Sequence, residues 1–84
     1  MATYSGSYVR TVTDCLRRFS HNNYIHMGID ELDEKPTVVK YVFYHSVSGL
    51  GCMVMVDFEL IDDLEITIES CLIALRRRFN LEDN

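Results

Sequence analysis

The sequence predicts an α+β domain, a three-stranded antiparallel sheet with two flanking helices in the order α-β-β-β-α. Apolar residues recur with helical spacing near both ends of the chain, and the middle holds two runs rich in β-branched and aromatic residues. Short loops place consecutive strands side by side, so these runs are expected to pair in a meander. Residues 1–84 are therefore predicted to form a single small globular domain.

The first helix is expected over residues 8–19, because the apolar positions there step by four, three, one and three. Its apolar stripe consists of Tyr8, Val12, Cys15, Leu16 and Phe19. Arg17 and Arg18 lie off this stripe in the expected last turn, where a cation is favoured by about 0.3–1 kcal/mol through the helix dipole.

Three strands are expected, over residues 24–29, 37–46 and 50–58. The second is the most strongly indicated, because seven of its ten residues are β-branched or aromatic. Residues 30–36, DELDEKP, hold four acids and the only proline, which predicts a solvated loop between the first two strands. Ser48 and Gly49 supply the turn before the third strand.

The second helix is expected to open at Asp62, with Glu65 completing a capping box. Its apolar stripe consists of Leu64, Ile68, Cys71, Leu72, Leu75 and Phe79. Its last turn holds three successive arginines, and the string SCLIALRRRFN resembles DCLRRFSHNN at the end of the first helix. These arginines are interpreted chiefly as charged helix ends. The alternative is an anion-binding site for phosphate or nucleic acid, formed by Arg17, Arg18, Arg76, Arg77 and Arg78.

Both faces of the sheet are predicted to be mostly apolar, where a sheet with one wet face would alternate apolar and polar residues. We expect the helices to cover the face that contains Val38, Val42, Val54 and Val56. The other face is expected to form a partner-binding patch of Val39, Tyr41, Phe43, Met53 and Met55. Two such sheets packed face to face would give a homodimer; a first helix that crosses to this face would instead give a monomer.

The charge balance argues against nucleic acid as a partner. The chain carries 13 acidic and 8 basic residues, a net charge of −5, whereas nucleic-acid binders usually carry the opposite sign. The acids expected in the loop are a second candidate partner-binding set, for a basic protein: Asp30, Glu31, Asp33 and Glu34.

Catalytic and metal-binding motifs are missing from the sequence. It has no Gly-rich phosphate loop, no G-x-S-x-G and no H-E-x-x-H, and its histidines and cysteines lack metal-ligand spacing. Cys52 and His45, across the expected hairpin, are the one nucleophile–base pair to consider. No cofactor, no metal and no enzymatic activity are therefore expected; a small enzyme with a site built at a dimer interface is the third alternative.

The leading prediction is a non-catalytic protein-binding module, such as a small acidic inhibitor or adaptor of the kind that viruses direct at host proteins. Three widely spaced cysteines argue for a reducing compartment, and neither a signal peptide nor a membrane-spanning apolar run is read. The expected location is the cytoplasm, of a cell or of an infected host, with no membrane association.

Overall fold

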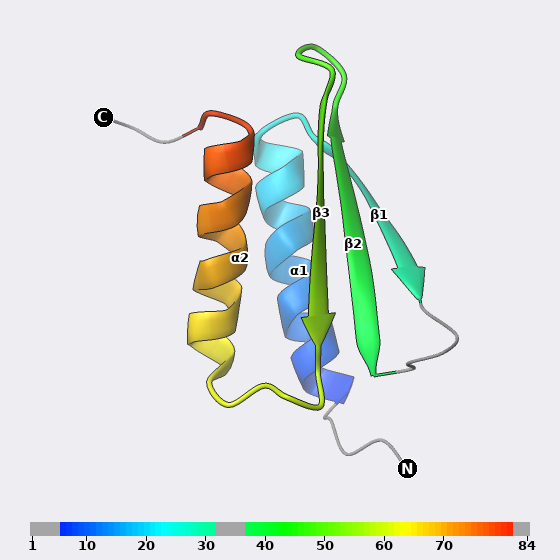
Figure 1. Cartoon of the computed structure of the whole chain (residues 1–84), viewed down its shortest axis with the longest axis vertical. Helices are drawn as coiled ribbons and strands as arrows, with labels where there is room; N and C mark the ends of the chain where they lie inside the picture. Colours follow the sequence, from blue (N-terminus) through cyan, green and yellow to red (C-terminus); the bar gives the residue numbers. More distant parts are fainter. Residues whose placement is uncertain (1–5, 32–36, 82–84) are drawn as a thin grey trace.

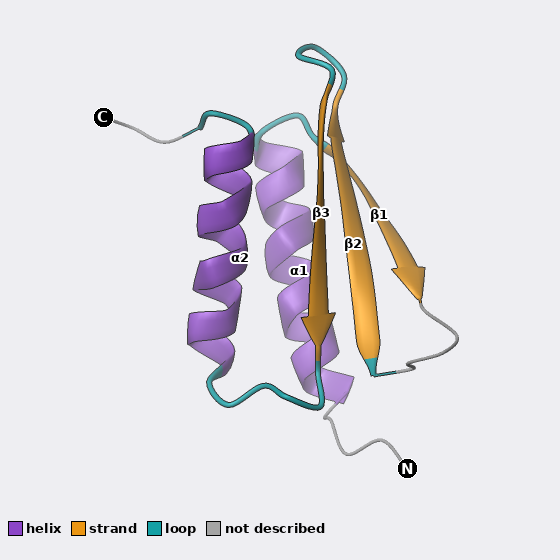
Figure 2. Cartoon of the chain, viewed as in Figure 1, coloured by secondary structure: helices purple, strands orange, loops and turns teal. Residues whose placement is uncertain are grey.

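The chain folds into two layers, a sheet and a pair of helices that both lie on one side of it (Figures 1 and 2). The computed structural model describes residues 6–31 and 37–81. The elements are, in chain order, α1 (Gly6–Asn22), β1 (His26–Glu31), β2 (Val38–His45), β3 (Leu50–Asp57) and α2 (Leu64–Arg78). The strands form one antiparallel sheet in the order β1-β2-β3. The predicted α-β-β-β-α order and the α+β class are confirmed.

The helix α1 is longer than its pattern predicted and ends at Asn22. Asn23 donates from Nδ2 to the carbonyl of Phe19 at 2.9 Å, and Tyr24 takes a left-handed conformation with φ of 58° that stops the helix. Arg17 and Arg18 therefore lie before the last turn, and their predicted place at the helix end is wrong.

The helix α2 begins one residue later than predicted. Its N-cap is Asp63, whose carboxylate accepts a hydrogen bond from the amide of Ile66 at 3.1 Å. An isoleucine cannot return the bond, so the expected capping box of Asp62 and Glu65 is wrong. At the other end Asn80 is left-handed and Leu81 donates to the carbonyl of Arg76, the pattern of a Schellman motif.

The strand register corrects the prediction of which residues share a face. Tyr41 lies opposite Val54 and Val42 lies opposite Met53, because the four-residue turn at 46–49 pairs His45 with Leu50. The expectation that Val39, Tyr41 and Phe43 share a face with Met53 and Met55 is therefore wrong. A change of one residue in register moves a whole strand's side chains to the other face.

The helices cover the face that contains Tyr41 and Phe43. These two side chains are fully buried with Val12 and Leu16 of α1 and Leu75 of α2. Of the four valines expected beneath the helices, Val54 and Val56 do line the core, whereas Val42 is exposed on the opposite face and Val38 is buried at the end of its strand. A dimer through Tyr41 and Phe43 would require the helices to leave the sheet.

The first strand starts and ends two residues later than predicted. Asp30 and Glu31 belong to β1 and pair with Lys40 and Val39, so the expectation that they lie in a loop is wrong. Asp33 and Glu34 lie outside the described residues.

Candidate functional site

The face of the sheet opposite the helices presents large apolar side chains to solvent. On β2 these are Val42 and Tyr44, and on β3 they are Met53 and Met55, with 40 to 58% of their surface exposed. We call these four residues the open face. The register places Met53 directly opposite Val42 and places Met55 beside it along β3, so the four side chains form one continuous patch.

Polar pairs flank the open face on the side of β1. The Lys40 ammonium lies 3.7 Å from the Asp30 carboxylate across the β1–β2 pair, and the His26 ring stacks on Tyr44 with 6.5 Å between centroids. A partly exposed ion pair of this kind stabilises a fold only slightly. Its effect here is to give the apolar patch a polar border.

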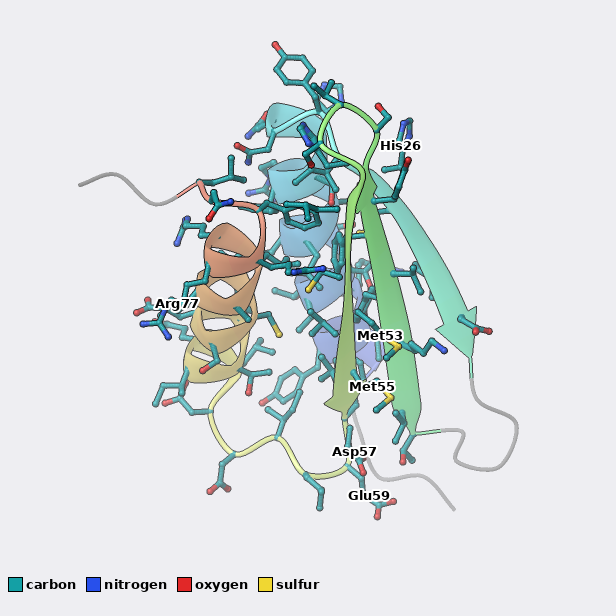
Figure 3. The ribbon with its side chains drawn as sticks, turned by 45° about the horizontal axis from the view of Figure 1, so that its top comes forward. His26, Met53, Met55, Asp57, Glu59 and Arg77 are labelled. Carbon is teal, nitrogen blue, oxygen red and sulfur yellow. The ribbon has the colours of Figure 1, made fainter. Side chains whose placement is uncertain are left out.

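An acidic group lies at the end of β3 nearest Met55. Figure 3 shows Asp57 and Glu59 at this end and His26 at the other. The Asp57 carboxylate accepts hydrogen bonds from Thr37 Oγ1 at 3.2 Å and from the Glu59 amide at 3.0 Å, which fixes its position. The open face is therefore bordered by negative charge at this end.

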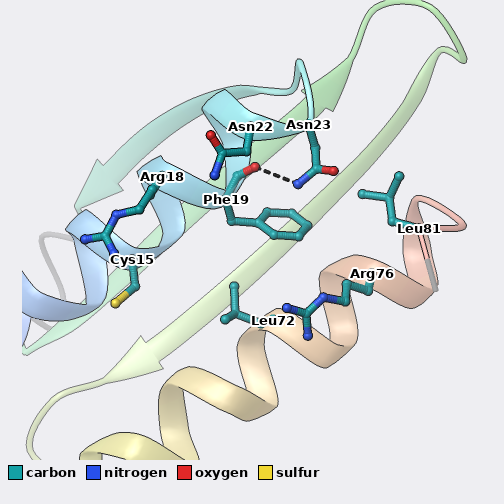
Figure 4. A pocket seen from close by; sticks show the side chains of 8 residues that line it. All are labelled: Cys15, Arg18, Phe19, Asn22, Asn23, Leu72, Arg76 and Leu81. Atoms are coloured by element: carbon teal, nitrogen blue, oxygen red, sulfur yellow. Dashed lines mark hydrogen bonds between the residues drawn. The ribbon is translucent and has the colours of Figure 1, made fainter. Parts of the chain in front are cut away.

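The five candidate arginines do not form one patch. Arg18 and Arg76 line the same groove, of about 320 Å³, between the two helices. Figure 4 shows them on opposite sides of it, with Phe19 and Leu72 between them and Leu81 at the end of the groove beyond Arg76. Arg78 instead donates from Nε to the carbonyl of Gly51 at 2.7 Å, and Arg77 lies on the side of α2 away from the sheet (Figure 3).

Cys52 and His45, the candidate nucleophile and base, are not hydrogen-bonded to each other. Cys52 lies opposite Phe43, whereas the Nδ1 of His45 is 2.8 Å from Ser48 Oγ and its ring packs edge-on to Phe79. In residues 6–31 and 37–81 no three histidine, cysteine or acidic side chains come close enough to hold a metal ion. No helix in that part of the chain is both long and apolar enough to cross a membrane.

Two groups with shifted pKa values belong to the core and not to a surface site. Burial raises the pKa of Tyr41, an effect that the hydrogen bond between its hydroxyl and Thr13 Oγ1, 2.7 Å long, partly offsets. Burial also raises the pKa of the Cys71 thiol. Neither side chain reaches the open face, so these shifts affect stability, not recognition.

The residues that sequence reasoning missed are Val42 and Tyr44. Lys40 could have located them, because Lys40, Val42 and Tyr44 are alternate residues of β2 and so share one face of the sheet. A lysine within a strand marks the face that meets solvent. Comparison with protein-family models, with curated protein sequences and with solved structures finds no match to the chain.

Proposed function

We propose that the protein is a non-catalytic protein-binding module whose binding surface is the open face of the sheet. The observation that carries this proposal is the exposure of Val42, Tyr44, Met53 and Met55 as one patch on the side of the sheet away from α1 and α2. Contiguous apolar patches on small domains usually mark interaction sites, because leaving them in water is unfavourable.

The chemistry of the surface favours a partner that is apolar at its centre and basic at its margin. Two methionines adapt their unbranched side chains to irregular surfaces, which suits a protein partner. Asp57 and Glu59 border the patch at one end, and the chain as a whole carries a charge of −5. Charge complementarity between this acidic margin and a basic partner mainly accelerates association and selects the partner. Such selective binding of one protein is what an inhibitor or adaptor requires.

The three cysteines are free, which supports a reducing compartment and therefore action in the cytoplasm, of a cell or of an infected host. An enzyme receives no supporting geometry from the Cys52 and His45 positions. Anion binding in the groove between Arg18 and Arg76 is the second candidate function, because that groove brings together one arginine from each helix.

The experiment compares Val42→Lys with Ile66→Lys in capture from extracts of the source cell or its host, with quantitative mass spectrometry. Val42 lies at the centre of the open face, whereas Ile66 is an equally apolar exposed residue on α2, with 64% of its surface exposed. Lysine at position 42 places a charge inside the interface and repels a basic margin. A partner should be retained by the wild type and by Ile66→Lys, and the amount captured by Val42→Lys should be at least about tenfold lower. A tenfold loss of affinity corresponds to ~1.4 kcal/mol, which is modest for a change at an interface.

Circular dichroism and thermal melts of both variants verify that the fold persists. Capture that is equal for the two lysine variants would show that the open face does not bind the partner.

A further inference from the structure

The outer edge of β3 presents backbone groups with which neither β1 nor β2 pairs. The Phe58 amide donates inward, to the carbonyl of Thr37 at 2.9 Å, and the Gly51 carbonyl accepts Arg78 from outside. Backbone groups alternate in direction along an antiparallel strand, so residues of odd number between these two points face outward. The amides and carbonyls of Met53 and Met55 therefore point away from β2, and nothing in the described part of the chain pairs with them.

This edge also has few of the features that usually prevent strands from pairing. Natural edge strands carry charges, prolines or bulges, or lie beneath a helix or loop. The strand contains no proline, its one charged residue is Asp57 at the very end, and Arg78 reaches only its first part. The opposite edge of the sheet, β1, ends in Asp30 and Glu31. The two edges therefore differ in degree, and β3, with one acid at its end against two adjacent acids on β1, is the less protected one.

The helix beside this edge carries small residues on the side that flanks β3. The contact of Arg78 with Gly51 shows which side of α2 flanks β3. Ala74, Ser70 and Thr67 precede Arg78 by four, eight and eleven residues, so they follow one another along that same side. All three side chains are small, and a neighbouring helix layer could approach closely there.

We propose that β3 pairs with β3 of a second copy, antiparallel about a two-fold axis. The three strands of each copy would form one continuous sheet with all helices on the same side. With Met53 of one copy opposite Met55 of the other, each pair exchanges two backbone hydrogen bonds, so the outward amides and carbonyls of these two residues satisfy one another, while the Gly51 carbonyl keeps its bond from Arg78. In this register Asp57 lies opposite Gly51, so two chains of charge −5 meet without facing carboxylates.

A second copy fits this edge because the strand is complementary to itself. Each outward residue offers both a donor and an acceptor, as a two-fold axis requires. The pairing uses backbone atoms and leaves the open face exposed in both copies. It is therefore separate from partner binding, and either proposal can fail without the other.

The test compares Met55→Pro with Met55→Ala by sedimentation velocity at micromolar concentration. Proline removes the outward amide of residue 55, which β2 does not use, so the sheet can accept it at this edge. The wild type and Met55→Ala, which keeps the amide, should sediment as dimers of the 9.8 kDa chain. Met55→Pro should sediment as a folded single chain, whereas Val42→Lys should remain dimeric.

A wild type that sediments as one chain, or a Met55→Pro variant that stays dimeric, overturns the proposal. Should Met55→Pro fail to fold, hydrogen exchange of the wild type decides. The amides of Met53 and Met55 should exchange more slowly as the concentration rises. Rates independent of concentration overturn the pairing, and protection that requires an added foreign protein assigns the edge to another strand.

Discussion

Tyr41 joins the two layers of the molecule at the level of a single residue. Its ring is fully buried beneath the helices, and its hydroxyl is 2.7 Å from Thr13 Oγ1 on α1. Burial is the largest influence on its pKa and raises it above the ordinary value of 10.0; the Thr13 hydrogen bond lowers it, Cys71 raises it and Arg17 lowers it. The phenol is thus held in its neutral form by the fold.

Replacing Tyr41 with Phe should lower the free energy of unfolding near pH 8 by about 0.5–1.5 kcal/mol, the value of one hydrogen bond. A pKa raised in the folded state means that the unfolded phenol loses its proton first. The stabilisation is therefore full below pH ~10 and is lost as the pH rises through the folded pKa. Tyr41→Phe should show a smaller alkaline loss, measured by urea unfolding between pH 8 and 11.

The matched control is Tyr44→Phe, because Tyr44 lies on the open face with 48% of its surface exposed. It should leave the free energy of unfolding at pH 8 unchanged. Cys71 contributes a loss of the same sign at lower pH, since burial raises its pKa above 9.0, and this contribution persists in both variants. Equal behaviour of the two phenylalanine variants would contradict the role given to Tyr41.

At the residue scale the helix stripes could be predicted and the sheet faces could not. Val12, Leu16 and Leu75 are buried as their spacing indicates, because helical period alone selects them. Both faces of β2 are apolar, so alternation could not show which one the helices cover. The number of residues in the 46–49 turn fixes only which residues of β3 share each face with β2, and Lys40 was the one local signal of the solvent side.

The helix α2 depends on the residues that it inserts between the sheet and α1. Leu75 is fully buried, whereas Ile73, two residues before it, has 37% of its surface exposed. We expect Leu75→Ala to lower the free energy of unfolding by about 2–5 kcal/mol through the cavity it leaves. This is a large share of the ~5–15 kcal/mol typical of a small domain.

Thermal or urea unfolding of Leu75→Ala and Ile73→Ala measures this difference. The Ile73 variant should lose much less stability, because its side chain leaves a smaller cavity. Similar losses in the two variants would mean that α2 packs through a different side.

Element order could be read from the sequence, and element ends could not. The order follows from the spacing of apolar residues, which repeats about every 3.6 residues in the helices and about every 2 residues in the strands. The ends of an element depend on single capping contacts, which adjacent residues in the sequence could make equally well. Asp63, and not Asp62, caps α2 by accepting from the Ile66 amide, and Asn23 caps α1 beyond Phe19. The candidate site was missed for the related reason that strand parity depends on the turn.

The charge of the whole molecule predicts weak interaction with polyanions. The net charge is −5, and the arginines point in several directions around two helices. We expect the protein to pass through a heparin column at about 0.15 M salt, because phosphate-like binding requires several converging cations. Retention that Arg18→Ala and Arg76→Ala abolish, but Arg10→Ala does not, would instead favour the groove as an anion site.

The helix layer is made from the first and last elements of the chain, which contact one another across it. During synthesis the three strands leave the ribosome before α2 exists, since chains emerge from the N-terminus. Until Leu75 arrives, the inner side of β3, with Val54 and Val56, has no cover from its own helix. A nascent chain paused before residue 64 would therefore expose apolar side chains of β3 on both faces, and it is at this stage that it would most need a chaperone.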